Sequence, residues 1–298
     1  INTVKRDIWQ MKFLTKLANS IRESSSVLCI GLDPNSARLP AQVRTFSEDP
    51  VEQVVYFCHQ VIQVTEKYCA AFKPNVAFFE ALGPHGLDAF NRVVSAIPNR
   101  HIIIADAKRG DINTTAEHYK QAFFDQFKVD AITLNPLMGM ETLEAFNGDS
   151  SKAVYALALT SNAGAQDFLL ARSGNFESLS AHIAHQLANT QKYSETHLGM
   201  VIGATQSQVA QQVLALHPKA ALLIPGFGAQ GGDIEALATL LTTHSGLPLI
   251  NSSRGILFDV NDNTDNDPTH GSWQDRVLER TVTANQRLLS IFEQVELN

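Results

Sequence analysis

The sequence has few cysteines, and they follow no metal-binding or disulfide pattern. Only Cys29, Cys58 and Cys69 occur among 298 residues, an odd number without CxxC spacing. Reduced thiols in a cytosolic protein are therefore expected rather than a disulfide framework or a zinc site. The ten histidines likewise show no HExxH or paired ligand spacing, so we expect no metal site.

Long hydrophobic runs and an excess of positive charge are also missing. No apolar run approaches the ~20 residues of a membrane helix, and no signal-peptide pattern is present, although the sequence starts at Ile1. Lys and Arg number 23 against 30 Asp and Glu, a net charge of −7. This balance argues against a general nucleic-acid binder, but a few local cations can still bind a small anionic substrate. We expect a soluble cytoplasmic enzyme.

The composition favours a large core, because 44% of the residues are hydrophobic and 18% are charged. Short apolar runs alternate with longer amphipathic stretches. Within each run the apolar residues are continuous, which is typical of parallel strands covered on both faces. The runs are Val27 to Leu32, Ala71 to Phe79, His101 to Ala105, Ala131 to Leu134, Ala153 to Leu159, Gly199 to Gly203, Ala221 to Ile224 and Leu247 to Asn251.

Helical patterns lie between these runs. They include Val51 to Cys69, Asn113 to Phe127, Phe176 to Lys192, Gln206 to His217 and Trp273 to Val295. The alternation gives eight strand–helix units, the number that closes a (β/α)8 TIM barrel, although an open doubly wound sheet has the same periodicity. No linker divides the chain, so residues 1–298 are predicted to form one catalytic domain. It would include an N-terminal helical extension (1–26) and a polar loop (259–272).

A barrel places its reactive side chains at the C-terminal ends of the strands and in the loops that follow. Asp106 and Lys108 follow the third apolar run, and residues two apart on a strand face the same side. Asp111 comes where the chain turns into the next helix. The simplest interpretation is a structural ion pair with Asp111 as a helix cap. Two carboxylates beside one ammonium would, however, leave an excess negative charge that is costly to bury.

The second apolar run contains a lysine, Lys73, in the sequence Phe72-Lys73-Pro74-Asn75. Lysine is rarely buried without a partner. It could be a surface lysine whose apolar stem lies along the barrel. Alternatively it supplies the second cation, and Lys73, Asp106, Lys108 and Asp111 together are neutral. This charge balance favours a functional site.

Polar residues follow two further strands. Asp33 ends the first strand and precedes Pro34, where it could organise a turn or accept hydrogen bonds from a sugar hydroxyl. Ser161 follows the fifth strand in Thr160-Ser161-Asn162. It could read the edge of a heterocycle or cap the following segment.

The seventh and eighth strands are followed by residues suited to a phosphate. The loop from Pro225 to Gly232 contains Gln230 and matches GxGxxG, but that dinucleotide fingerprint belongs in the first strand–helix turn. Ser253 and Arg254 follow the eighth strand. The loops after strands seven and eight form the usual phosphate site of such barrels. Backbone N–H groups and a bidentate arginine suit a phosphate dianion.

These motifs resemble the orotidine 5′-phosphate decarboxylase family, in particular its longer bacterial-type branch. The resemblance spans Gly31 to Arg254, in the family's order. It rests on Asp106-x-Lys108-x-x-Asp111-Ile112 with Thr115, on Phe72-Lys73-Pro74-Asn75, on the glycine-rich loop with Gln230, and on Ser253-Arg254-Gly255. The sequence departs locally at Arg109-Gly110 and in the acidic segment from Asp259 to Asp267, neither of which changes a matched position.

The resemblance implies roles for the matched residues. It implies a homodimer with shared active sites, no cofactor, and a second-subunit contribution from Asp111, Ile112 and Thr115. Within one chain, Lys108, Asp106 and Lys73 would be catalytic. Substrate would be contacted by Asp33 and Lys73 at the ribose, Asn75 as a helper, Ser161 at the pyrimidine, and Pro225, Gln230, Ser253 and Arg254 around the phosphate.

The reaction implied is the conversion of orotidine 5′-phosphate to uridine 5′-phosphate and carbon dioxide. The nearest enzymatic alternative is a magnesium-dependent sugar-phosphate decarboxylase or epimerase on a related barrel. Such enzymes need an acidic metal ligand on strand two, where this sequence has Lys73. A non-catalytic barrel that binds a phosphate ligand is a further alternative. Retention of the complete charged set argues against this last alternative.

Overall fold

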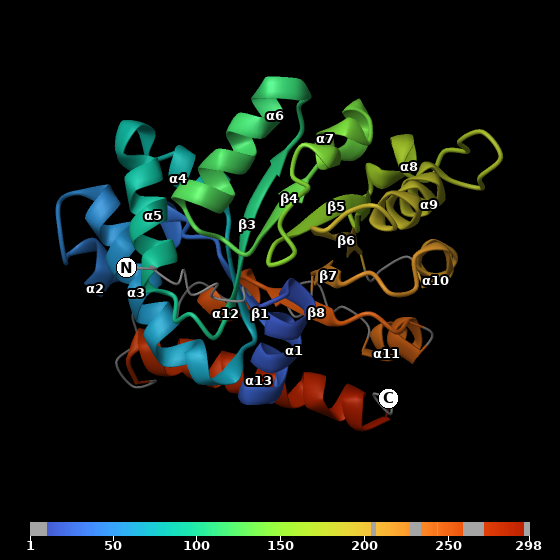
Figure 1. The fold of residues 1–298 in the computed structure, drawn as a ribbon. Coiled ribbons are helices and arrows are strands. Elements are labelled where there is room, and N and C mark those ends of the chain that lie inside the picture. Colours follow the sequence, from blue (N-terminus) through green and yellow to red (C-terminus); the bar gives the residue numbers. More distant parts are fainter. Residues whose placement is uncertain (1–10, 204–206, 227–233, 243, 259–270, 295–298) are drawn as a thin grey trace, which may run out of the picture.

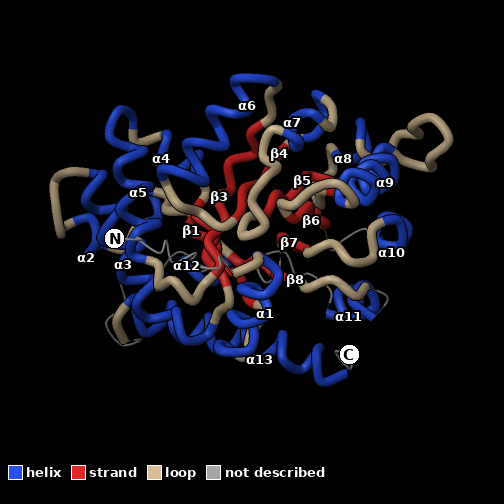
Figure 2. Tube along the Cα trace, viewed as in Figure 1, coloured by secondary structure: helices blue, strands red, loops and turns tan. Residues whose placement is uncertain are grey.

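The chain folds into a closed barrel of eight parallel strands surrounded by helices (Figures 1 and 2). The computed structural model describes residues 11–203, 207–226, 234–242, 244–258 and 271–294. Each strand pairs with its sequence neighbour, and β8 pairs with β1 to close the sheet. The predicted (β/α)8 barrel is confirmed, and closure excludes the open doubly wound sheet.

The strands are short and are buried on both faces. They comprise β1 (Leu28–Leu32), β2 (Ala71–Pro74), β3 (Ile102–Arg109), β4 (Ala131–Leu134), β5 (Ala153–Leu159), β6 (His197–Ile202), β7 (Leu222–Pro225) and β8 (Pro248–Ser252). All strands run in the same direction, so their C-terminal ends meet at one mouth of the barrel.

Helices cover the outside of the barrel. They are α1 (Phe13–Ser24), α2 (Ala41–Arg44), α3 (Pro50–Thr65), α4 (Val76–Glu80), α5 (Gly86–Ala96), α6 (Asn113–Lys120), α7 (Glu141–Glu144), α8 (Ala165–Phe168), α9 (Leu179–Gln191), α10 (Ser207–Leu216), α11 (Ile234–Thr242), α12 (Arg254–Leu257) and α13 (Trp273–Gln294). A π-helical turn, Gln121–Gln126, extends α6.

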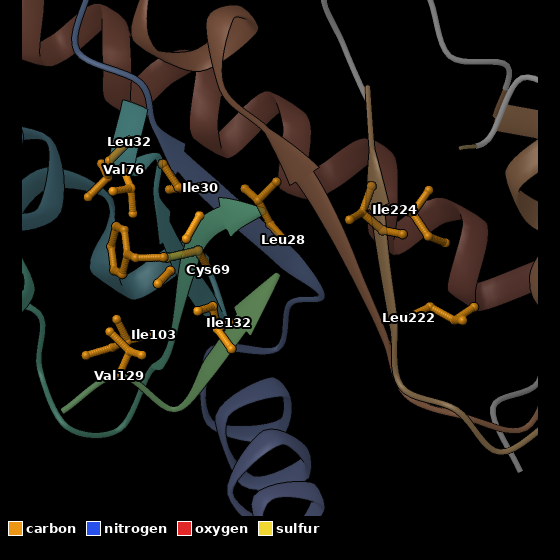
Figure 3. Close-up of a cluster of buried hydrophobic side chains, with 14 of the residues drawn as sticks. Leu28, Ile30, Leu32, Cys69, Val76, Ile103, Val129, Ile132, Leu222 and Ile224 are labelled. Atoms are coloured by element: carbon orange, nitrogen blue, oxygen red, sulfur yellow. The ribbon is translucent and has the colours of Figure 1, made fainter. Parts of the chain in front are cut away.

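Successive strand residues alternate between two apolar layers, because the side-chain period of a strand is two. The outer layer lies between the strands and the helices. Figure 3 shows part of it, with Leu28, Ile30 and Leu32 from β1 and Ile132 from β4. The inner layer fills the barrel with smaller side chains around one large ring, Tyr155. The continuous apolar runs of the sequence therefore supply both layers.

Helix α1 closes the N-terminal end of the barrel. Phe13 and Leu17 on this helix are buried against the inner layer. Polar contacts fix the helix to the strand entrances: Lys16 Nζ lies 2.6 Å from Asp130 Oδ1, and the Ser20 hydroxyl donates to the carbonyl oxygen of Ala70. The Asp130 carboxylate also accepts a hydrogen bond from the Ile103 N–H. Helix α1 thus covers one end of the barrel, and the C-terminal strand ends form the mouth at the other end.

Two strand boundaries differ from the sequence prediction by more than two residues. The apolar run Ala71 to Phe79 divides into β2 and the short helix α4, because Asn75 accepts a hydrogen bond from the Ala77 N–H and caps that helix. β3 continues to Arg109, four residues beyond its apolar run. In both places polar residues belong to the strand end, where a hydrophobicity pattern carries no signal.

The helices that the structure describes include none with the length and apolar character to cross a membrane. Cys29, Cys58 and Cys69 are all free and buried. Burial raises the pKa of the Cys29 thiol to about 12, which keeps it protonated and unreactive at neutral pH.

Candidate active site

Three charged side chains meet at the mouth of the barrel. Lys73 lies on β2, and Asp106 and Lys108 lie two residues apart on β3, so both face inward. The two Asp106 oxygens are divided between the two lysines: Oδ2 binds Lys73 Nζ and Oδ1 binds Lys108 Nζ. A backbone bridge between Asn75 and Asp106 holds the ends of β2 and β3 together. The predicted core of the site is therefore assembled within one chain.

Burial distinguishes the three groups. The side chains of Lys73 and Asp106 are 5% and 9% exposed, whereas that of Lys108 is 51% exposed. The surface-lysine interpretation of Lys73 is therefore wrong. Lys73 and Asp106 form a fixed buried pair, and Lys108 reaches from that pair into the open mouth. The lysine that a substrate can contact most freely is Lys108.

The attraction between the opposite charges outweighs the cost of burying them. Burial alone would raise the pKa of Asp106, but the attraction of Lys73 and Lys108 outweighs it and holds that pKa well below its usual value. Burial likewise opposes the charged form of Lys73. The attraction of Asp106 and of the nearby Asp33 outweighs this effect, and the pKa of Lys73 is raised. Both groups are therefore charged at neutral pH.

Asp33 lies close enough to influence this cluster electrostatically. Its Oδ1 atom is buried, and among the described residues it has no hydrogen-bond partner. A buried acceptor without a partner is costly in a free protein and is available to a ligand donor. The predicted position of Asp33 beside the site is thus compatible with a substrate hydroxyl.

Gly31 and Ser253 approach closely between β1 and the end of β8. A Cβ atom on Gly31 would lie 1.8 Å from the Ser253 hydroxyl oxygen, so only glycine fits here. Asn251 donates a hydrogen bond of 3.3 Å to the same hydroxyl. Glycine in β1 therefore leaves room for the Ser253 side chain where β1 meets the end of β8.

Asp111 stands apart from the cluster in its own chain. Its carboxylate accepts a hydrogen bond from the adjacent Ile112 N–H, and within the described ranges it makes no ion pair. It is not a helix cap, because α6 begins at Asn113 and Ile112 occupies the capping position. Thr115 is exposed on α6, and Asp111 and Ile112 are partly exposed. The four-residue charge balance expected from the sequence is not formed within one chain.

Asn75 and Ser161 lie at the ends of two other strands. The Asn75 side chain caps α4, as described above, which fixes the direction of its amide. Ser161 is partly exposed after β5 and does not cap a helix, since α8 begins at Ala165 behind Gly164. A hollow of about 180 Å³ lies beside Ser161, lined among others by Asn135, Leu157 and Thr160. Thr160 and Asn162, the neighbours of Ser161, line this hollow, and Ser161 itself does not.

The phosphate-binding residues are described in part. Pro225 ends β7 and is partly exposed, and Ser253 precedes α12, the short helix that starts at Arg254. The Arg254 side chain is exposed at this mouth. Gln230, and the polar segment from 259 to 269, lie outside the described residues. Pro225 and Asn251, two residues before Ser253, are paired across β7 and β8, so these two strand ends lie side by side.

One residue at the site was not predicted, and one on the opposite face of β3 was noted without a structural role. Thr133 on β4 is 1% exposed, and its hydroxyl bonds to both Asp106 and Lys108. Arg109, noted only as a local departure, is held by Glu80 and by the carbonyl oxygen of Ala107, and lies over the Tyr119 ring. For Thr133 the sequence did contain a signal. It is a polar residue inside the apolar run Ala131 to Leu134, and a buried hydroxyl needs a hydrogen-bond partner.

A larger hollow of about 420 Å³ lies away from this mouth, between α7 and α9. Its lining includes Glu144, Asn189 and Tyr193 and none of the predicted site residues. Size alone therefore does not identify the site. The charged cluster, which combines buried opposite charges with one accessible ammonium, is the stronger indicator.

Known proteins share both the sequence and the fold. Residues 26–264 match the sequence profile of the "Orotidine 5'-phosphate decarboxylase / HUMPS family". The chain is 38% identical over 248 residues to the orotidine 5′-phosphate decarboxylase of Porphyromonas gingivalis, covering 82% of this chain and 87% of that protein. It is 36% identical over 252 residues to the enzyme of the same name from Dehalococcoides mccartyi, covering 83% and 89%.

A solved structure gives the same result. The structure of Leishmania donovani OMP decarboxylase superposes with a TM-score of 0.72 at 29% identity, and the match covers 93% of this chain and 99% of that one. The family profile covers most of the barrel and all of the charged residues at its mouth. By sequence and by fold, the chain belongs to the orotidine 5′-phosphate decarboxylase / HUMPS family.

Proposed function

We propose that this protein decarboxylates orotidine 5′-phosphate to uridine 5′-phosphate and carbon dioxide, in the synthesis of pyrimidines. The observation that carries the proposal is the Lys73–Asp106–Lys108 array at the barrel mouth, with its two inner members buried and its outer lysine accessible. Such an array suits a reaction that develops negative charge on carbon and then needs a proton. The names of the relatives support the same substrate.

The chemistry follows from the charge that the reaction creates. The bond from C6 to the carboxylate breaks, its electron pair stays on C6, and no ring carbonyl delocalises that pair directly. Preorganised charge in a closed site is the remaining means of stabilisation. The Lys108 ammonium stabilises the carbanion and then donates a proton to C6. The resulting neutral amine regains its proton from solvent after product release.

The carboxylates have a second role in this proposal. Asp106 holds both lysines, as its two oxygens bind their ammonium groups. Asp106 and Asp111 also crowd the substrate carboxylate, and this repulsion is relieved as carbon dioxide leaves. Asp111 would act in a neighbouring subunit, together with Ile112 and Thr115. Its separation from the cluster of its own chain supports this arrangement, and the working form is therefore a homodimer with shared sites.

The rest of the substrate would lie across the mouth. Asp33 and Lys73 would contact the ribose hydroxyls with help from Asn75, and Ser161 would read the pyrimidine. The phosphate would lie among Pro225, Gln230, Ser253 and Arg254. Binding energy from this remote phosphate could be used to close the site over the reacting carbon.

The remaining assignments complete the proposal. The protein acts in the cytoplasm as one catalytic domain over residues 1–298, with an N-terminal helical extension and a polar loop over 259–272. It uses neither cofactor nor metal, and it binds neither nucleic acid nor membranes. The net charge of −7 supports the absence of nucleic-acid binding.

One assay separates this function from its alternatives. The purified protein is incubated with orotidine 5′-phosphate, with and without EDTA, and the loss of substrate absorbance is followed. We expect uridine 5′-phosphate to form at the same rate in both. Activity lost with EDTA and restored by magnesium would favour the metal-dependent sugar-phosphate alternative. No turnover in either, with substrate still bound, would favour a non-catalytic phosphate-binding barrel.

The phosphate assignment predicts a change in KM. Arg254→Ala removes a bidentate charge-assisted contact, worth about 1.5–3 kcal/mol, so KM is expected to rise roughly 10- to 150-fold. Steady-state kinetics on orotidine 5′-phosphate measure it. Arg22→Ala is the control, because Arg22 is exposed on α1 at the end of the barrel that this helix covers. An unchanged KM in Arg254→Ala would show that the phosphate lies elsewhere.

A further inference from the structure

Thr133 is the polar residue that links the two catalytic side chains of β3 to the next strand. It lies on β4 among apolar neighbours and is 1% exposed. Its hydroxyl donates to Asp106 Oδ1 at 3.1 Å and accepts from the backbone N–H of Lys108 at 3.0 Å. A hydroxyl has one proton. Because the Lys108 N–H can only donate, that proton must point to Asp106.

The backbone of Lys108 needs this support. Its φ angle is +47°, in the left-handed region that side chains other than glycine rarely adopt. Such a conformation costs on the order of 1–3 kcal/mol and persists where surrounding contacts enforce it. The pairing of β3 with β4 shifts register between Ala105 and Arg109. In that interval the Lys108 N–H bonds to the Thr133 hydroxyl instead of to a strand carbonyl.

The same hydroxyl also constrains the other end of the lysine. Asp106 Oδ1 accepts both from Lys108 Nζ and from Thr133. Thr133 therefore binds the backbone N–H of Lys108. It also binds the Asp106 oxygen that accepts a hydrogen bond from the Lys108 ammonium. Loss of the hydroxyl would free both ends while leaving the charges in place.

We infer that Thr133 is a positioning residue of the decarboxylation site, which sets where the Lys108 ammonium meets the reacting carbon. The inference rests on the proposed function. Displacement of a reacting group by ~1 Å can cost about 10²-fold in rate. Lys108 stabilises mainly the transition state, whereas the contacts to the ribose and the phosphate already bind the substrate in the ground state. Removal of the hydroxyl should therefore lower kcat and leave KM nearly unchanged.

The test compares two substitutions with a control. Thr133→Val keeps the shape of the side chain and removes the hydroxyl, and kcat is expected to fall roughly 10- to 100-fold with KM within about 2-fold. Thr133→Ser keeps the hydroxyl and is expected to retain kcat within about 3-fold. Thr281→Val is the control. Thr281 is equally buried on α13, and its hydroxyl donates to the carbonyl oxygen of Val277 on the same helix.

The outcomes are distinct. Wild-type kcat in a folded Thr133→Val variant would overturn the inference, and so would equal losses in Thr133→Val and Thr133→Ser. If Thr133→Val does not fold, Thr133→Ala replaces it, because the smaller side chain cannot overpack the barrel. Wild-type protein is assayed in parallel. Failure of the wild type to convert orotidine 5′-phosphate would refute the proposed function, whereas failure of the inference leaves an active wild type with unchanged variants.

Discussion

Replacement of Lys108 by alanine is expected to lower kcat by at least about 10⁴-fold, because it removes both the charge that stabilises the carbanion and the proton donor. Lys108 is the accessible member of the array, with a side chain that is 51% exposed. Without Lys108, Lys73 and Asp106 still keep their own direct contact. Uridine 5′-phosphate, the product, should therefore still bind with a Kd within about 3-fold of the wild-type value.

Two measurements check this expectation. Single-turnover kinetics report the chemical step, and calorimetric titration with uridine 5′-phosphate reports binding. Lys67→Ala is the matched control, since Lys67 is an exposed lysine in the turn that precedes β2. Product formation by Lys108→Ala at the wild-type rate would refute the catalytic assignment. A complete loss of ligand binding would instead mean that Lys108 organises the pocket.

The second large effect concerns both rate and stability. In Asp106→Asn the side chain keeps its shape but loses its charge, so the buried Lys73 ammonium loses the carboxylate that it contacts directly. Breaking a buried ion pair in this way costs about 3–5 kcal/mol. The rate should fall as well, by at least about 10²-fold, because Asp106 also fixes Lys108. Asp88→Asn is the control, because the Asp88 side chain is 65% exposed and its free energy of unfolding should change by less than ~0.5 kcal/mol.

The stability loss in Asp106→Asn should depend on pH. The folded-state pKa of Asp106 is held well below its usual 3.8. The ionised Asp106 carboxylate therefore contributes fully to the free energy of unfolding above its usual pKa. This contribution is lost as the pH falls from there towards the lower pKa of the folded state. Urea unfolding of wild type and variant should show a gap that is constant between about pH 6 and pH 5 and narrows towards about pH 3. A gap that stays constant across this range would mean that the stabilisation does not come from the ionised carboxylate.

The fold could be predicted well from the sequence, and the reason lies in the two apolar layers. Residues such as Leu28 and Cys29 are adjacent in sequence but belong to the outer and inner layers, so every strand appears as a continuous apolar run. The count of eight runs with intervening helices then favours a closed barrel, and the pairing of β8 with β1 excludes the open sheet. Strand ends are different: β3 continues through Asp106 to Arg109, because the polar mouth, not the core, determines its last residues.

The charged cluster could be predicted because strand periodicity alone places Asp106 and Lys108 on one face. The residue on β4 that forms hydrogen bonds with this cluster could not be predicted in this way. Thr133 forms hydrogen bonds across a register shift, and register depends on how two strands meet in space. Asp111 illustrates a different limit. Its negative charge makes the sum of the four charges zero. Whether it acts in its own chain depends on how subunits assemble, and residue spacing within one chain does not determine that.

The helix that covers the N-terminal end of the barrel has a consequence for synthesis of the chain. Helix α1 leaves the ribosome before the strands of the barrel, and its contact from Lys16 to Asp130 spans 114 residues. At translation speeds of about 5–20 residues per second, that partner appears on the order of ten seconds later. Until then Phe13 and Leu17 have no inner layer to pack against. Helix α1 is thus made well before the inner layer that it covers, and during that interval its apolar face is expected to be accessible to chaperones.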